Sequence, residues 1–119
     1  MELPCTRPDS RELVKIKVND ICYIDLVKGD KIRFNTIDGL YLFRLSGSLE
    51  ACTNLFDQFG FHPLDSVNVV NMSMVKFIKV SMYSRIAYFN EQETVSTSVS
   101  RNGLRKVKEE FPKITIIEV

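Results

Sequence analysis

The sequence is poor in the residues on which most metal and disulfide sites are built. It has no Trp, a single His and only three Cys among its 119 residues. Cys5, Cys22 and Cys52 lack CxxC spacing, and one His cannot complete a zinc site with ligands so far apart. We therefore expect no metal site and no disulfide. Cys22 and Cys52 stand among apolar residues and are predicted to be buried thiols, whereas Cys5 is predicted to be an exposed free thiol.

Motifs of the common enzyme classes are also absent. The sequence contains no Gly-rich phosphate loop, no GxSxG element and no plausible Cys–His pair. We interpret His62, which precedes Pro63, as a surface residue in a turn rather than a general base. The acidic residues are scattered, and nothing in their spacing points to a catalytic carboxylate pair. The sequence predicts that the protein is not an enzyme, with no cofactor and no small-molecule substrate.

Long apolar runs and an excess of one charge are lacking too. No stretch of about 18 apolar residues occurs, and the segment 1–12 has prolines and charges in place of a signal peptide. We predict a cytoplasmic protein without a membrane segment, in which the cysteines stay reduced. Sixteen Lys and Arg face fifteen Asp and Glu, which gives a net charge of +1. Any binding of nucleic acid must therefore depend on local clusters of basic residues.

Apolar residues are plentiful enough for one packed core. They make up 45% of the sequence and include eight Phe, which suits a single domain at this length. No internal repeat or flexible linker is visible after residue 12. We predict an N-terminal extension over residues 1–12 and a single domain over residues 13–119.

Short runs of β type dominate that domain. Residues 14–18 alternate apolar and basic side chains, which is the pattern of a strand with one face in water. Turn residues separate the later runs, and Asp38-Gly39 is a strong hairpin signal. The predicted strands are residues 14–18, 21–27, about 32–34, 40–45, 67–70, 77–80, 85–89, 94–99 and 113–119.

Two segments have helical spacing instead. The first lies between Ser48, its predicted N-cap, and Gly60, its predicted C-terminal stop. Its apolar face carries Leu49, Cys52, Phe56 and Phe59. The second runs from residue 100 to about 111 and ends before Pro112. Its apolar stripe carries Leu104, Val107 and Phe111. The sequence thus predicts a mainly β fold with one internal helix and one C-terminal helix.

Basic residues cluster in two places. Lys28 and Lys31 flank a predicted turn, and four more begin the last helix or lie on its outer face: Arg101, Arg105, Lys106 and Lys108. Loops and helix starts can reach DNA phosphates. The same clusters also fit an ordinary solvated surface that Glu109 and Glu110 partly balance. Charge alone leaves both interpretations open.

The order of segments from Asp20 to about Lys108 resembles the LytTR family, the DNA-binding domains of AgrA- and LytR-type bacterial regulators. Residues 20–25, Asp-Ile-Cys-Tyr-Ile-Asp, are similar to the family's D-I-x-Y-I-[DE] strand. Residues 61–71 are similar to F-x-x-x-H-[RN]-S-[FY]-x-V-N, with Phe61, Val70 and Asn71 in register. Residues 98–101, Ser-Val-Ser-Arg, are similar to the family's P-V-S-R element.

The resemblance implies an elongated arrangement of short, mostly antiparallel sheets that presents loops to the major groove. It implies a sequence-specific, bacterial-type regulator of transcription whose partner is double-stranded DNA, with a homodimer on repeated sites as a further option. Base contacts would come from Lys31, Ser66 and Arg101. Contacts that position the DNA backbone would come from Lys28, Arg105 and Lys106.

The middle motif departs from the family pattern. Asp65-Ser66-Val67 stands where His, then Arg or Asn, then Ser are expected, and the Asp65 carboxylate would repel phosphate unless it is paired. Together with the small net charge, this departure favours an alternative function. The chain would then have a LytTR-like fold that has lost DNA binding and acts as a dimerisation or protein-interaction module.

Overall fold

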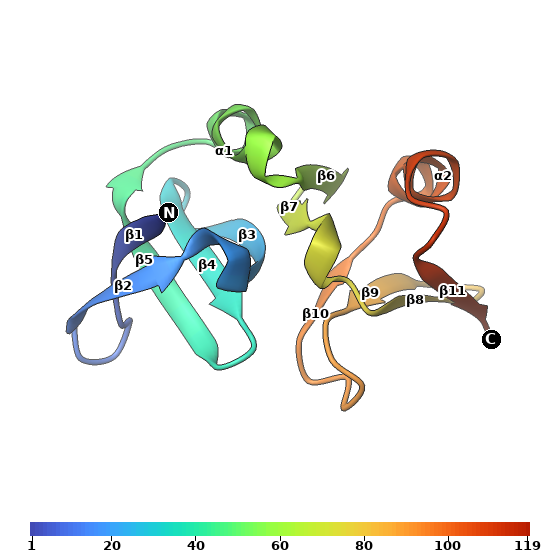
Figure 1. The fold of residues 1–119 in the computed structure, drawn as a ribbon, viewed down its shortest axis with the longest axis horizontal. Coiled ribbons are helices and arrows are strands. Elements are labelled where there is room, and N and C mark those ends of the chain that lie inside the picture. Colours follow the sequence, from blue (N-terminus) through green and yellow to red (C-terminus); the bar gives the residue numbers. More distant parts are fainter.

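The computed structural model describes all residues, Met1–Val119, as eleven strands and two α-helices (Figure 1). The strands form two sheets that lie side by side along the long axis of the molecule, with both helices on one side of them. The molecule is elongated, with extents of 41 × 29 × 26 Å. The prediction of a mainly β fold with one internal and one C-terminal helix is confirmed.

The first sheet has seven strands, and all of its neighbouring pairs are antiparallel. Its strand order is β2-β1-β5-β4-β3-β7-β6. The predicted hairpin at Asp38-Gly39 joins β4 to β5, where the Thr36 hydroxyl accepts from the backbone N–H groups of both turn residues. The bounds are β1 Glu2–Thr6, β2 Leu13–Lys17, β3 Ile21–Val27, β4 Lys31–Thr36, β5 Gly39–Ser46, β6 Phe61–Asp65 and β7 Asn68–Asn71.

The second sheet has four short strands in the order β10-β9-β8-β11. Its one parallel pair joins β11 to β8, while its other pairs are antiparallel. The bounds are β8 Phe77–Val80, β9 Arg85–Tyr88, β10 Ser96–Ser98 and β11 Thr115–Glu118. Short 3-10 helices span Val18–Asp20, Asp57–Phe59 and Met72–Met74.

Both helices begin with the caps that the sequence predicts or provides. Helix α1, Leu49–Phe56, starts after Ser48, whose hydroxyl accepts from the Ala51 N–H at 3.1 Å. Gly60 follows the helical segment in the left-handed conformation, with φ of 84°, as its predicted stop position requires. Helix α2, Arg101–Glu110, starts after Ser100, whose hydroxyl accepts from the Gly103 N–H at 2.9 Å.

Two apolar cores hold the fold together, and the strands between them face both. Phe34, Phe56 and other residues of the first sheet and α1 form one core. Val107 of α2 and Ile78 of the second sheet belong to the other. In β7, Val69 packs into the first core while its neighbour Val70 packs into the second, because successive strand residues point to opposite faces. Strands β3, β7 and β6 therefore form the wall that joins the two halves.

The prediction that Cys5 is an exposed thiol is wrong. The relative exposure of Cys5 is 0%, and burial raises the pKa of its thiol to about 11. The segment 1–12, expected as an extension, contributes strand β1 between β2 and β5. Leu3 and Cys5 alternate inward on this strand, and Cys5 lies opposite Phe43. Two inward residues around Pro4 are too weak a pattern to indicate a strand.

His62 also differs from its expected place. It lies half-buried in strand β6 rather than in a surface turn, with its ring 5.2 Å from the ring of Phe111. Pro63 is tolerated in this strand because β6 is an edge strand of the sheet, where a missing N–H breaks no ladder on the open side.

Candidate nucleic-acid interface

The sheet register brings two of the predicted contact segments to one end of the first sheet. Strand β3 runs antiparallel to β7, with Ile24 opposite Val69. The end of β3 and the start of β7 therefore lie at the same end of the sheet. The β3–β4 turn, with Lys28 and Lys31, consequently lies at the same end as the β6–β7 turn, which contains Ser66.

Helix α2 brings the third segment to the same place. The backbone N–H of Ser100 donates to the Leu64 carbonyl at 2.8 Å, and the Ser100 hydroxyl donates to the same oxygen at 3.1 Å. The start of α2 is thus bonded to the β6–β7 hairpin, while the far end of the helix packs near His62. We call the β3–β4 turn, the β6–β7 turn and the start of α2 at Ser100–Arg101 the loop edge.

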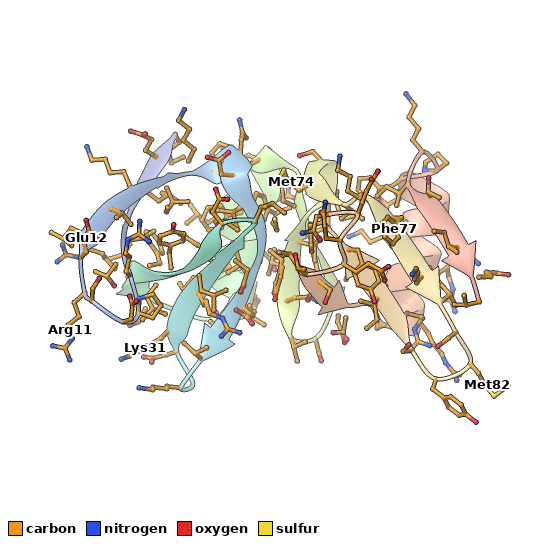
Figure 2. All side chains as sticks on the ribbon, turned by 90° about the horizontal axis from the view of Figure 1, so that it is seen from below. Arg11, Glu12, Lys31, Met74, Phe77 and Met82 are labelled. Carbon is orange, nitrogen blue, oxygen red and sulfur yellow. The ribbon has the colours of Figure 1, made fainter.

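Figure 2 labels one residue of the loop edge, Lys31. Lys31 lies toward the lower left of the view, whereas Met74, which follows β7, lies on the opposite side. The positive end of the α2 dipole points toward the loop edge, because the helix begins there. The arrangement therefore gathers two turns and a helix start on one side of the molecule.

Most of the predicted basic contact residues on this edge are free to meet a ligand. Lys28, Lys31, Arg101 and Arg105 are exposed, and so is Ser66. The three ion pairs of the chain lie elsewhere, at Arg7–Glu12, Arg33–Asp25 and Lys79–Glu93. None of the four cations forms an ion pair within the chain. The loop edge also carries two carboxylates, Asp30 in the β3–β4 turn and Asp65 beside Ser66, so its cations are unpaired but its charge is mixed.

Lys106 is the predicted contact residue that the fold does not bring together with the others. Arg101 and Arg105 are four residues apart and share a helix face. Lys106 follows Arg101 by five residues, which turns it roughly 140° around the helix. Its side chain is half-buried on the other flank of α2.

Asp65, the departure from the family motif, has a structural role in the turn. One of its carboxylate oxygens accepts from the Ser98 hydroxyl at 2.7 Å, and the other accepts from the Ser66 N–H at 2.7 Å. Both donors are neutral, and the bond from Ser98 holds the carboxylate against β10. The negative charge beside Ser66 is thus fixed in place by the fold.

Asn68 is a buried residue that sequence analysis missed. Its relative exposure is 1%, and its side-chain oxygen accepts from the backbone N–H groups of Leu64 and Asp65. Its amide nitrogen donates to the Thr97 hydroxyl and the Ser98 carbonyl, both at 2.8 Å. All four hydrogen-bonding positions of the amide are used. The signal was present in the sequence, because Asn68 stands where the family motif has an aromatic residue.

Gly103 is a second missed residue, and it explains why α2 can approach the hairpin. A Cβ atom at this position would lie 2.1 Å from the Leu64 carbonyl oxygen. Glycine normally weakens a helix interior, so its presence here reflects the close contact with β6. The contact sets the position of Arg101 at the loop edge.

Two other arginines near the predicted interface are occupied within the fold. Arg33 pairs with Asp25 through two hydrogen bonds, which raise the pKa of the guanidinium. Its charge is therefore balanced within the first sheet. Arg85 is half-buried, and its Nε donates to the Val99 carbonyl at 3.0 Å. It holds β9 to the segment that leads into α2.

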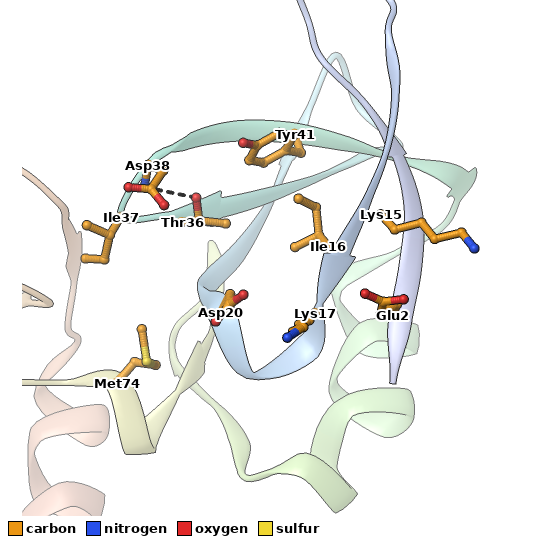
Figure 3. A pocket seen from close by; sticks show the side chains of 10 residues that line it. All are labelled: Glu2, Lys15, Ile16, Lys17, Asp20, Thr36, Ile37, Asp38, Tyr41 and Met74. Carbon is orange, nitrogen blue, oxygen red and sulfur yellow. Dashed lines mark hydrogen bonds between the residues drawn. The ribbon is translucent and has the colours of Figure 1, made fainter.

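One hollow lined by charged residues lies away from the loop edge. It has a volume of about 290 Å³ and lies beside the β4–β5 turn, at the opposite end of the first sheet (Figure 3). Two lysines, Lys15 and Lys17, and three carboxylates line it together with apolar side chains. Tyr41, at its wall, is buried, and the dashed line in Figure 3 joins the Asp38 N–H to the Thr36 hydroxyl. The hollow presents no concentrated charge of one sign.

The chain also lacks two other kinds of feature. No group of three His, Cys, Asp or Glu side chains is placed to hold a metal ion. Neither helix has the length and apolar content needed to cross a membrane.

Comparisons with known proteins identify the fold. No family model and no curated protein matches the sequence. A solved structure from Bacillus cereus, described as the LytTr DNA-binding domain of a putative methyl-accepting/DNA response regulator, matches with a TM-score of 0.70. It is 13% identical, and the match covers 91% of this chain and 94% of that chain. The LytTR-like fold implied by the sequence resemblance is therefore confirmed by structure.

Proposed function

We propose that this LytTR-like chain is a sequence-specific DNA-binding regulator of transcription, of bacterial type, that docks its loop edge onto double-stranded DNA. One observation carries the proposal. Three segments that are distant in the sequence meet on one side of the molecule. Four exposed cations, three on these segments and Arg105 on the next turn of α2, form no ion pair within the chain. The name of the Bacillus cereus structure supports the same activity.

The positions of the side chains suggest a division of roles. Lys31 and Arg101 have donors that suit guanine edges in the major groove, and Ser66 can make a weaker contact between them. Lys28 and Arg105 would bind phosphates and fix the register of the protein on DNA. Lys106 contributes least in this arrangement, because it lies on the other flank of α2. The long dimension of 41 Å corresponds to about 12 base pairs of duplex.

A dimerisation or protein-interaction module is the alternative, and one observation favours it. Leu45 and Leu55 are exposed by 64% and 49% and border a small apolar hollow between β5 and α1. A partner protein could cover this surface. The hollow is only about 110 Å³, whereas the loop edge joins three segments of the chain.

Binding to random-sequence duplex over a series of salt concentrations tests the proposal. Neutralised phosphates release counterions, so the logarithm of the binding constant should fall linearly with the logarithm of salt concentration. A selected high-affinity sequence should then bind more tightly than random duplex at every salt concentration. Absence of binding at low salt, with the protein folded, would remove DNA as the partner and favour the interaction module.

A further inference from the structure

The β8–β9 turn, Ser81 to Ser84, ends in two large side chains that the fold does not use. Met82 and Tyr83 are exposed by 83% and 91%, more than any other large hydrophobic residue of the chain. Tips of two residues usually carry Gly, Asn or Asp, which suit tight turns and water. Neither Met82 nor Tyr83 has a positive φ, so the backbone of the turn does not explain these two residues.

Hydrogen bonds between its two serines close the turn. The Ser81 N–H donates to the Ser84 carbonyl at 2.8 Å, and the Ser84 N–H donates to the Ser81 hydroxyl at 3.2 Å. The two hydroxyl oxygens lie 3.0 Å apart. The side chains of Met82 and Tyr83 take no part in these bonds. They project from a turn that the two serines close.

Backbone bonds place this turn next to the loop edge. Strand β10 pairs with β9, with Ser98 opposite Ile86. The next residue, Val99, donates its N–H to the Arg85 carbonyl at 3.0 Å. Because α2 starts directly after Ser100, its start lies beside the β8–β9 turn. Figure 2 shows Lys31 and Met82 toward opposite ends of the same long side.

The turn differs from the loop edge in charge. Its four residues, Ser-Met-Tyr-Ser, carry no charge at neutral pH. In the adjoining strands, Lys79 is paired with Glu93 at 2.9 Å. Arg85, whose Nε donates to the Val99 carbonyl, is offset by Glu118 at the strand position opposite Val80, so these four charges sum to zero. The surroundings therefore do not favour phosphate. An uncharged aromatic and a thioether instead suit sugars and base edges, and many proteins place apolar side chains in the minor groove.

We propose that Met82 and Tyr83 form an additional DNA contact, seated against the sugars and base edges of the minor groove that flanks the segment read by the loop edge. This inference rests on the proposed function, because it requires that the loop edge faces DNA. The contact would extend the footprint beyond the three loops. It would add affinity without adding a phosphate contact.

The salt dependence of binding separates this contact from the cationic ones. Tyr83→Ala should weaken binding to a selected long duplex by about 5- to 10-fold. This is near the lower limit of the loss for an aromatic ring that stacks on a base, because the Tyr83 ring would contact sugars and base edges instead. The slope of binding against salt should stay at the wild-type value, because no counterion is released. Leu13→Ala is the control, since Leu13 is exposed by 64% on β2, at the far edge of the first sheet.

A fluorescent reporter tests the location of the contact directly. The chain has no Trp, so Tyr83→Trp introduces a single reporter at the tip of the turn. Its emission should be quenched or shifted on titration with duplex, while the emission of Leu13→Trp should not change. A duplex shortened by about five base pairs on the flanking side, a little under half a helical turn, should abolish the response and leave binding through the loop edge.

Each outcome decides between the two proposals. If wild-type protein binds no duplex, the proposed function fails and this inference fails with it. If wild-type protein binds but Tyr83→Ala binds equally well, or the emission of the Tyr83→Trp variant is unchanged on binding, only the flanking contact is overturned. A lower salt slope for Tyr83→Ala would also overturn it, by indicating a phosphate contact. A change of oligomeric state in Tyr83→Ala would overturn it as well, by assigning the turn to self-association.

Discussion

Arg101 and Lys106 lie on one helix, but their side chains face different surroundings. Arg101 is the first residue of α2 at the loop edge and is exposed. Lys106 is half-buried on the opposite flank, more than one turn further along. The two residues are equivalent in a count of basic residues, but they differ in exposure and in the side of α2 on which they lie. A matched pair of alanine variants can therefore separate position from charge.

Arg101→Ala should weaken binding to a selected duplex by about 1–3 kcal/mol if the guanidinium contacts a base edge in two places. If Arg101 contacts only phosphate, the loss should be equal on all sequences and the salt slope should fall by about one. Lys106→Ala should cause the smaller loss on the same duplex. Fluorescence anisotropy over a salt series measures both variants. Equal losses for the two would show that the docking proposed for α2 is incorrect.

Cys5 gives a prediction for alkaline pH. Burial raises the pKa of the Cys5 thiol to about 11, above the value of about 9 expected in the unfolded chain. Because the pKa of the Cys5 thiol is higher in the folded than in the unfolded chain, the stability that the buried, protonated thiol provides is complete below pH 9. It is lost as pH rises toward and through 11. Thiolate formation in the unfolded chain should reduce the free energy of unfolding by about 2 kcal/mol by about pH 11.

Urea unfolding of wild type and Cys5→Ala between about pH 8 and about pH 11 measures this effect. The difference in unfolding free energy between the two proteins should narrow as pH rises, because only wild type has the Cys5 thiol. Other alkaline groups, including Cys22 and Cys52, are common to both proteins and cancel in the comparison. A difference that stays constant across the range would mean that Cys5 is exposed, as the sequence alone suggested.

At the scale of elements, the contact between α2 and β6 fixes the geometry of the loop edge. Gly103→Ala would gain up to about 1 kcal/mol from helix propensity. The added Cβ would meet the Leu64 carbonyl oxygen at 2.1 Å, and overpacking of this kind typically costs about 1–3 kcal/mol or more. The steric cost should win, because backbone atoms on both sides leave little room to relax. We expect a net loss of unfolding free energy and weaker DNA binding.

Chemical denaturation of Gly103→Ala beside Asn102→Ala provides the measurement. Asn102 is exposed on the same turn of α2, so its alanine variant reports the propensity gain without the steric contact. Asn102→Ala should be neutral or slightly more stable than wild type. A Gly103→Ala variant as stable as Asn102→Ala would contradict the close approach of α2 to β6.

The elements also show which parts of the fold the sequence could predict. Strands with alternating or continuous apolar runs, such as β3 and β5, and both capped helices lie close to their predicted positions. Pairing between distant segments was not readable in the same way, because nothing local in Thr115–Glu118 indicates that it runs parallel to β8. The candidate site divides similarly. Basic residues were visible in the sequence, whereas Asn68 and Gly103 have meaning only once β6, β10 and α2 come together.

At the scale of the whole molecule, the two sheets differ in how firmly their strands are tied. Strands β3, β4 and β5 have six to eight residues each, whereas the strands of the second sheet have three or four. Fewer bonds per strand allow local opening at lower free energy. Native-state hydrogen exchange should therefore show β8, β9 and β10 opening below the free energy at which β3 and β4 exchange. A single common opening energy for both sheets would mean that the two cores unfold as one unit.

Two sets of residues make up the loop edge. One set, which includes Asn68, holds the turns in place, and the other set would face a ligand. Asn68, Ser100 and Gly103 hold the β6–β7 turn and the start of α2 together through buried or backbone contacts. Lys28, Lys31, Ser66 and Arg101 project from those turns without bonding to one another. Substitution of these four exposed residues would therefore leave the backbone of the turns unchanged. A library in which these four positions are randomised should therefore consist of folded variants. Such a library could yield proteins of the same fold that bind other DNA sequences.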